Sequence, residues 1–138
     1  MKNFAVDNLE ERAKGIGASD GGTAIGVNDY RSEYDLYLEK TGQSTPTDIS
    51  DIPAVIHGTA MEPVVFEMIK NRLNIPARRD NKTHYHPEHK WMFMHIDGRY
   101  LNENKIIEIK CPSIHMREFY GTEGTDQIPQ MYIAQATH

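Results

Sequence analysis

The segment KIIEIKCPS, residues 105–113, limits the possible folds of this chain more than any other. Its isoleucines are typical of a strand inside a sheet, yet a glutamate and a lysine interrupt them. Because strand side chains point alternately to opposite faces, Ile107 and Ile109 share one face, and Glu108 and Lys110 share the other. Unpaired charges are costly in a buried strand. Either Glu108 and Lys110 neutralise each other at a sheet edge, or they lie in a cleft and take part in chemistry.

The clearest predicted helix is HGTAMEPVVFEMIKNRLN, residues 57–74. Apolar side chains recur in it at helical spacing, at Val65, Met68, Ile69 and Leu73. Pro63 is tolerated only near the first turn of a helix, so the helix is expected to begin shortly before it. Glu62 then lies on or beside the buried stripe, near the start of the helix.

A strand is also predicted for WMFMHID, residues 91–97, with Asp97 at its end. Gly98 and the NEN at 102–104 mark a hairpin that leads back through KIIEIK. Asp97, Glu108 and the upstream Glu62 are therefore expected to converge. Carboxylates gathered at one cleft repel each other unless a cation lies between them, and Mg²⁺ prefers such hard oxygen ligands.

The spacing Asp-x(10)-Glu-x-Lys is the signature of the PD-(D/E)xK nucleases. The spacing alone occurs often by chance. Here it stands in the context of a strand, a hairpin and a second strand, with an acidic helix upstream. A metal-activated water, with Lys110 to orient it as the ammonium or to accept its proton as the neutral amine, suits attack on a phosphodiester.

Other helices are predicted from their end signals. Ser32 with Asp35 has the spacing of a capping box, and Gly42 is the expected end of that helix. Ser19 is the predicted N-cap of a short helix through Ala24. A last helix is expected to start around Pro129, and residues 43–53 are expected to form an exposed loop.

Composition sets broad limits. A chain of 138 residues is expected to form one domain. No apolar stretch approaches the length of a membrane span, and the N-terminus lacks the apolar region of a signal peptide. The single cysteine, Cys111, fits a reducing cytosol. The net charge of −5 gives no general argument for nucleic acid, so DNA binding requires a local basic surface.

Six blocks, taken in order along nearly the whole chain, resemble the YqaJ-like viral recombinases, a branch of the PD-(D/E)xK superfamily related to phage lambda exonuclease. The blocks are RAKGIGASD (12–20), YRSEYDLYLEKTG (30–42), HGTAMEPVV (57–65), HPEHKWMFMHIDG (86–98), IIEIKCPS (106–113) and IPQMYIAQATH (128–138). The resemblance implies an α/β, restriction-endonuclease-like core, a mixed central sheet flanked by helices, in a single nuclease domain over residues 1–138. It also implies that the family's domain continues past His138, so the chain is expected to be truncated at its C-terminus.

The resemblance further implies a metal centre built from three carboxylates and one backbone carbonyl, contributed by Glu62, Asp97, Glu108 and Ile109. The ion would be Mg²⁺, with Mn²⁺ as a substitute, and Lys110 would be the catalytic lysine. Arg12 and Ser19 match family residues that hold a terminal 5′-phosphate, and Gln135 matches a glutamine near the active site. His95 stands where relatives often have a small residue, which leaves the phosphate contacts there open.

By the same resemblance, the chain is expected to digest one strand of linear double-stranded DNA from the 5′ end in phage-type recombination. A single-strand annealing protein is the implied partner, and a trimer is the implied assembly. The implied location is the cytoplasm of a bacterial host, as a phage or prophage product, without membrane association.

Two alternatives stay open at this point. The first is a truncated, non-catalytic module that binds DNA or another protein through the same scaffold. The second is a structure-specific endonuclease, which would cut circular or branched DNA.

Each site residue also has a plain structural interpretation. Glu62 would form a capping box with Thr59, and Glu108 with Lys110 an ion pair on an edge strand. The histidines at 84, 86, 89 and 95 show no structural-zinc spacing, and Trp91 is expected to be a core anchor. Arg78 and Arg79 are expected to be solvated loop charges unless they face DNA. For each residue alone the plain interpretation is favoured, and only their coincidence supports the nuclease.

Overall fold

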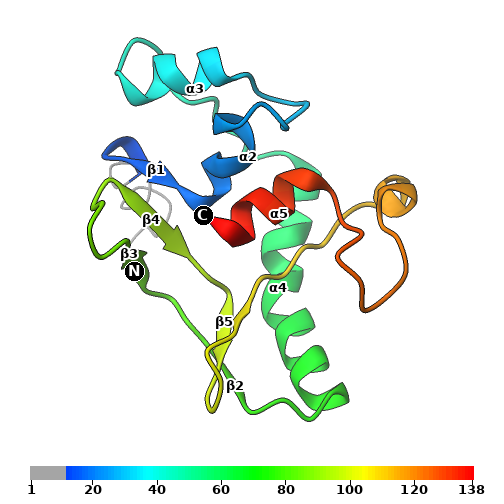
Figure 1. Cartoon of the computed structure of the whole chain (residues 1–138). Helices are drawn as coiled ribbons and strands as arrows, with labels where there is room; N and C mark the ends of the chain where they lie inside the picture. Colours follow the sequence, from blue (N-terminus) through cyan, green and yellow to red (C-terminus); the bar gives the residue numbers. More distant parts are fainter. Residues whose placement is uncertain (1–11) are drawn as a thin grey trace. The chain divides into compact units, whose positions relative to one another are not determined.

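The structure is a computed structural model that describes residues 12–138. The chain divides into two compact units, which are drawn together in Figure 1 and described separately here. The first unit contains the residues up to Pro46, Thr83–Met94 and Glu123–His138. The second contains Thr47–Lys82 and His95–Thr122.

The first unit combines a small sheet with short helices. Its elements are β1 (Ile16–Gly17), the 3₁₀ helix η1 (Ala18–Asp20), α2 (Gly21–Ala24), α3 (Glu33–Lys40), β3 (Thr83–Tyr85), β4 (Met92–His95, whose last residue falls in the second unit) and α5 (Gln130–Thr137). The strand order is β1-β4-β3, and β1 runs parallel to β4 with Ile16 opposite Met92. Segments far apart in the sequence therefore share one sheet (Figure 1).

Helix α3 follows its predicted end signals. The Ser32 side chain accepts a hydrogen bond from the Asp35 N–H, and the Asp35 carboxylate accepts one from the Ser32 N–H. The helix ends at Lys40, and Gly42 then adopts a positive φ of 71°. The capping box and the glycine stop are both confirmed.

Two glycines allow α5 to pack closely on α2. A Cβ on Gly21 would lie 3.2 Å from the Ala134 carbonyl oxygen, and one on Gly22 would lie 3.0 Å from the Met131 Cα. The predicted start of α5 is confirmed, because Pro129 is its N-cap. At its other end, His138 Nε2 lies 3.1 Å from the Ile16 carbonyl oxygen.

The second unit is a long helix with a three-stranded sheet. Its elements are α4 (Pro53–Arg72), β2 (Ala77–Arg79), β5 (Gly98–Tyr100), β6 (Ile106–Ile107) and the 3₁₀ helix η2 (Ile114–Phe119). The strand order is β2-β5-β6, and both pairings are antiparallel. The predicted return of the chain at residues 102–104 is observed, but it joins β5 to β6. The strand predicted for residues 91–97 overlaps β4 instead, which belongs to the sheet β1-β4-β3, so the expected pairing of that strand with KIIEIK is wrong. The expected mixed α/β character is observed, with the strands in two three-stranded sheets.

The contact between Phe66 and Gly98 fixes α4 against β5. Phe66 is only 2% exposed, and a Cβ on Gly98 would lie 2.4 Å from its Cε2 atom. The Arg78 carbonyl oxygen would be only 2.8 Å from the same Cβ. Only a residue without a side chain therefore allows the Phe66 ring to pack on the middle strand.

Three further expectations from the sequence are wrong. Helix α4 begins at Pro53, so Pro63 lies in its interior and Thr59 is not its N-cap. Proline is favoured in the first turn of a helix, and Pro53 provides that start instead. Ser19 lies within η1, whose N-cap is Gly17. Trp91 is 54% exposed, and the buried aromatic of β4 is Phe93.

No helix within residues 12–138 is both long enough and apolar enough to cross a membrane.

We expect Gly98→Ala to lower the free energy of unfolding by about 1–3 kcal/mol, because the new methyl group overpacks a buried contact. Gly58→Ala is the matched control, since Gly58 lies inside α4 and has nothing within 4 Å of an added Cβ. That control is expected to stabilise the chain by about 0.5–1 kcal/mol, the usual gain from replacing a helical glycine. Urea unfolding of both variants measures the difference, and equal effects would contradict the packing argument.

Candidate functional site

The strand register of the second unit brings Asp97 and Glu108 together. Gly98 on β5 lies opposite Ile107 on β6. In an antiparallel pair, one step back along β5 corresponds to one step forward along β6, so Asp97 lies across from Glu108. A direct contact agrees with this register, because the Ile109 N–H donates to Asp97 Oδ2 at 2.5 Å.

Helix α4 adds Glu62 to this pair. Glu62 lies four residues before Phe66, so the two share one face of the helix. Burial raises the pKa of Glu62 above its ordinary value, and the negative charges of Asp97 and Glu108 contribute to the rise. The Arg79 guanidinium acts in the opposite direction. The three predicted carboxylates therefore form one electrostatically coupled group.

Each carboxylate of this group is held by a donor of its own. Arg79 forms an ion pair with Glu62 Oε1, and Asp97 accepts the Ile109 N–H. Lys110 Nζ lies 2.6 Å from Glu108 Oε1, with both side chains half-buried. The ion pair that the plain interpretation expected for Glu108 and Lys110 is thus observed, just after the edge strand β6.

The three carboxylates are of the chemical type that binds a hard divalent cation, but they are not arranged as a complete set of metal ligands. Within residues 12–138, no three carboxylate, imidazole or thiol side chains converge closely enough to hold a metal ion as they stand. The chemistry of the three coupled carboxylates nevertheless suits Mg²⁺, which is bound by hard oxygen ligands. Burial and, after it, the negative charges of Asp97 and Glu108 raise the pKa of Glu62, and a cation bound among these carboxylates would offset both effects.

The adjacent strand β2 supplies two residues that sequence reasoning did not assign to the site. Arg79, at the end of β2, lies opposite Gly98 and contacts Glu62. The N–H of the buried Asp80 donates to the Asp97 carbonyl oxygen at 3.3 Å, so the backbone at Asp97 is fixed as well. Arg79 is 17 residues from Glu62 in the sequence, and no local pattern links the two.

In the first unit, Arg12 and Ser19 lie side by side, and their role in holding a phosphate stays a prediction. Arg12 Nη2 donates to Ser19 Oγ at 3.0 Å, and both residues are exposed. Lys40 supports them from α3, because its Nζ donates to the Arg12 carbonyl oxygen at 2.5 Å. A cationic side chain and a hydroxyl group side by side are suitable donors for an anionic oxygen.

Behind this pair lies a buried carboxylate that the sequence did not single out. Asp20 is 2% exposed and accepts the Gly17 N–H at 3.1 Å. Arg31 and Lys40 form ion pairs with it at 3.0 and 2.8 Å. Burial alone would raise the pKa of Asp20, but the Lys40 ammonium, the Gly17 N–H and Arg31 outweigh it and leave that pKa below its ordinary value. Lys40 thus ties Asp20 to the backbone of Arg12.

Gln135 also belongs to the first unit. It is half-buried on α5, a helix that contacts both α2 and η1, the turn that carries Ser19. Helix α5 is therefore placed beside the predicted phosphate pair, and the role of Gln135 stays a prediction.

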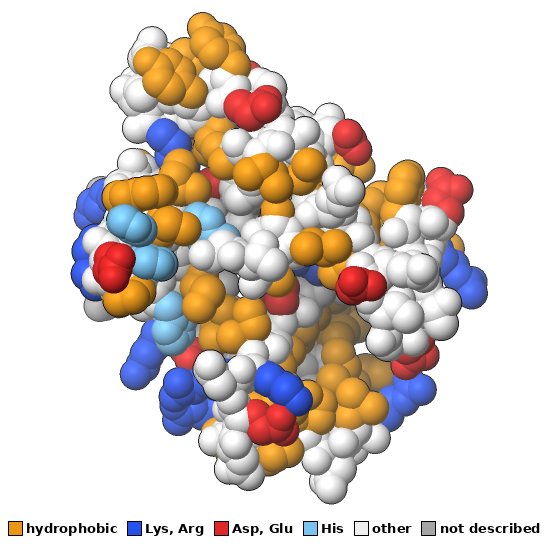
Figure 2. Space-filling view, in the orientation of Figure 1, with side chains coloured by type: hydrophobic (Ala, Val, Ile, Leu, Met, Phe, Trp, Pro, Cys, Tyr) orange, Lys and Arg blue, Asp and Glu red, His pale blue; other side chains and the backbone are white. Residues whose placement is uncertain are grey.

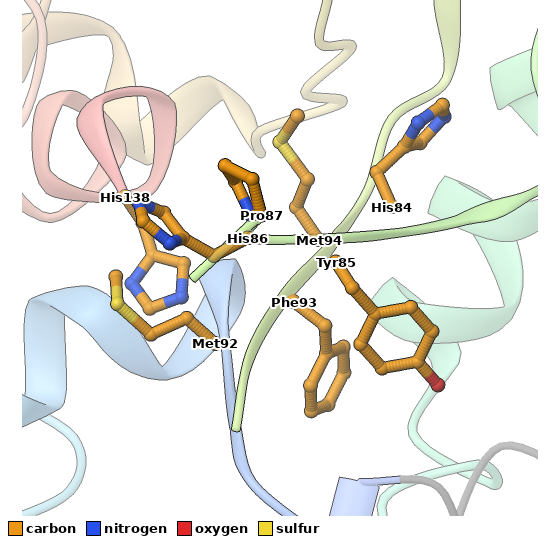
Figure 3. A pocket seen from close by; sticks show the side chains of 8 residues that line it. All are labelled: His84, Tyr85, His86, Pro87, Met92, Phe93, Met94 and His138. Carbon is orange, nitrogen blue, oxygen red and sulfur yellow. The ribbon is translucent and has the colours of Figure 1, made fainter. Parts of the chain in front are cut away.

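A pocket of the first unit contains none of the predicted site residues. It is lined mainly by apolar and imidazole side chains, drawn in Figure 3: His84, Tyr85, His86, Pro87, Met92, Phe93, Met94 and His138. Figure 2 shows several histidine side chains near one another on this face. The rings of His86 and His89 stack at 4.9 Å, and His86 Nδ1 accepts the N–H groups of Glu88 and His89. These contacts give the histidines a structural role in the β3–β4 turn.

Comparison with known proteins gives the family of this sequence. The family profile described as the YqaJ-like viral recombinase domain matches residues 7–138. The protein YqaJ of Bacillus subtilis (strain 168) is 32% identical over 130 residues, which are 94% of this chain and 40% of that protein. The chain thus spans less than half the length of this relative.

Solved structures show the same fold at low sequence identity. The alkaline exonuclease LHK-Exo of Laribacter hongkongensis matches with a TM-score of 0.64 at 17% identity, over 94% of this chain and 64% of that one. Its complex with dAMP matches with a TM-score of 0.62 at 19% identity, over 92% of this chain and 62% of that one. The expected restriction-endonuclease-like α/β class is confirmed.

Because Asp20 is buried and its pKa is lowered, we expect the free energy of unfolding of the chain to fall at acidic pH. A carboxyl group with a lowered pKa contributes stability that is full above the ordinary value of 3.8 and is lost as the pH falls through the lower folded value. Asp20→Asn is therefore expected to be less stable than the wild type at pH 7, and this difference is expected to shrink below pH 3.8. Denaturant unfolding across pH 2–7, a range chosen to span the ordinary carboxyl pKa of about 4, tests this. A difference independent of pH would contradict it.

Proposed function

The chain belongs to the YqaJ-like viral recombinase family, and we propose that it is a divalent-metal-dependent deoxyribonuclease that degrades linear double-stranded DNA from its ends. The coupled group of Glu62, Asp97 and Glu108, with Lys110 in contact with Glu108, carries this proposal. The likeness in fold to an alkaline exonuclease supports it.

The proposed chemistry is hydrolysis of a phosphodiester. The oxygen of a water molecule forms a bond to phosphorus, and the bond from phosphorus to the leaving oxygen breaks. The water gives up a proton to the solvent, and the leaving oxygen takes one up from the solvent. A bound divalent cation would supply positive charge near the phosphate and favour loss of a proton from water. Glu62, Asp97 and Glu108, with the Ile109 carbonyl, would hold that cation.

Lys110 has the position of a residue that acts on the water or the phosphate. Its ammonium lies 2.6 Å from a proposed metal ligand, Glu108, and is therefore held at the edge of the cation site. There it orients the attacking water and donates to the phosphate oxygens, on which negative charge increases as the new bond forms. Asp97 is fixed by its backbone and by the Ile109 N–H, which limits the movement of the site.

The finer parts of the proposal concern the DNA end. Arg12 and Ser19 are proposed to hold a terminal 5′-phosphate, which would set the direction of digestion as 5′ to 3′, with Gln135 nearby. Mg²⁺ is the proposed ion, with Mn²⁺ as a substitute. We further propose a role in phage-type recombination in a bacterial cytoplasm, with a single-strand annealing partner and assembly as a homo-oligomer, a trimer by family likeness.

One observation favours a second candidate, a binding module without turnover. Every carboxylate of the group already has a donor, and no described residues form a ready-made metal cage. A module of this kind would bind DNA without cutting it, so metal-dependent turnover separates the two functions.

Lys110→Ala is expected to reduce the rate of DNA digestion by at least about 100-fold, the usual effect of losing a donor to oxygens on which negative charge develops. The assay follows loss of one strand of linear duplex DNA in Mg²⁺ and in EDTA, with circular duplex as a test for endonuclease cutting. Lys105→Ala is the matched control, because Lys105 lies on the same hairpin, is exposed and pairs with Glu103. DNA binding without any digestion by the wild type would favour the binding module.

Arg12→Ala is expected to reduce digestion of 5′-phosphorylated DNA by about tenfold or more, because a charged hydrogen bond to the phosphate is lost. Digestion of DNA with a 5′-hydroxyl is expected to change much less. Lys14→Ala serves as the control for general charge, since Lys14 is exposed and close to Arg12 in the sequence. Equal losses on the two substrates would rule out Arg12 as the phosphate contact.

A further inference from the structure

We propose that Arg79 is the built-in counter-cation of the carboxylate group and that a divalent ion competes with it for Glu62. This inference rests on the proposed function, because it concerns the same site. It adds a residue that sets how tightly the site takes up its cation.

The contact itself is direct. Arg79 Nη2 forms an ion pair and hydrogen bond with Glu62 Oε1, and about a third of each side chain is exposed. Strand β2 holds Arg79 opposite Gly98, the residue next to Asp97. Arg79 therefore lies on the strand next to β5, and Asp97 directly precedes β5.

The guanidinium is held on one side only. Arg79 Nε is buried and has no hydrogen-bond partner among the residues that the structure describes. A guanidinium has five N–H donors and satisfies its full capacity only with several acceptors. Arg79 is thus bound to Glu62 through Nη2, and its Nε has no acceptor among the described residues. If the side chain moves away from Glu62, no hydrogen bond at Nε has to break.

Charge balance explains why a cation and Arg79 compete. Arg79 contacts Glu62 and Lys110 contacts Glu108, so the cationic side chains lie against the oxygens that a metal ion would use. A divalent ion bound at Glu62 would be repelled by the adjacent guanidinium. A cation that binds Glu62 Oε1 therefore displaces Arg79 from that oxygen or shares the oxygen with it.

The experiment measures cation uptake without DNA and therefore without catalysis. Isothermal titration calorimetry with Mg²⁺ and with Mn²⁺ is carried out on the wild type, Arg79→Gln and Arg78→Gln. Arg78 is the matched control, because it is the preceding residue of β2, exposed where Arg79 is half-buried. We expect Arg79→Gln to bind the ions about three- to fivefold more tightly, in keeping with the strength of a partly exposed ion pair, and Arg78→Gln to match the wild type.

Thermal unfolding supplies a second measurement that does not depend on calorimetric heats. In EDTA, Arg79→Gln is expected to melt below Arg78→Gln, because the carboxylates lose a neutralising charge. Added Mg²⁺ is expected to raise its melting temperature by more than that of the wild type, since tighter binding to the folded state stabilises it more. Arg79→Lys keeps the charge and is expected to bind cations much as the wild type does.

Equal or weaker cation binding by Arg79→Gln would overturn the inference alone. Weaker binding would mean that Arg79 holds Glu62 in the geometry needed by the metal. If neither the wild type nor any variant binds Mg²⁺ or Mn²⁺, the cofactor of the proposed function is wrong and the inference is overturned with it.

Discussion

The packing of Phe66 on Gly98 is the contact on which the candidate site depends. It fixes one face of α4 against the middle strand of the second unit, and Glu62 lies one helical turn from Phe66 on that face. On the strand side, Asp97 directly precedes Gly98 and lies across from Glu108. One close contact between a ring and a glycine thus sets the relative positions of three carboxylates that come from separate parts of the chain.

The two units neutralise their acidic side chains in different ways. The difference indicates a structural role for Asp20 and a functional role for Glu62. Asp20 is buried with two cationic partners and a backbone N–H, and its pKa lies below the ordinary value, as expected for a structural ion pair. Glu62 has a cationic partner too, yet its pKa is raised by burial and by the neighbouring Asp97 and Glu108. A carboxylate that remains under-neutralised in this way is typical of a functional site.

The sequence predicted the elements whose signals are local. The capping box at Ser32, the glycine after α3 and the start of α5 after Pro129 each depend on a few neighbouring residues, and all are confirmed. It failed where a signal was ambiguous or distant. The start of α4 was placed near Pro63 because Pro53 was assigned to the preceding loop, and the role of Arg79 depends on strand pairing that no local pattern records.

The charges within KIIEIK are explained by where strand β6 ends. The ladder stops at Ile107, so Glu108 and Lys110 lie beyond the paired strand, and the Ile109 N–H is satisfied by the Asp97 carboxylate instead of a neighbouring strand. The sheet edge makes the charges tolerable, because they pair with each other and remain partly exposed. The two interpretations of this segment are therefore compatible: the ion pair at the edge keeps Lys110 beside the carboxylates, which is where a lysine that acts on a phosphate must be.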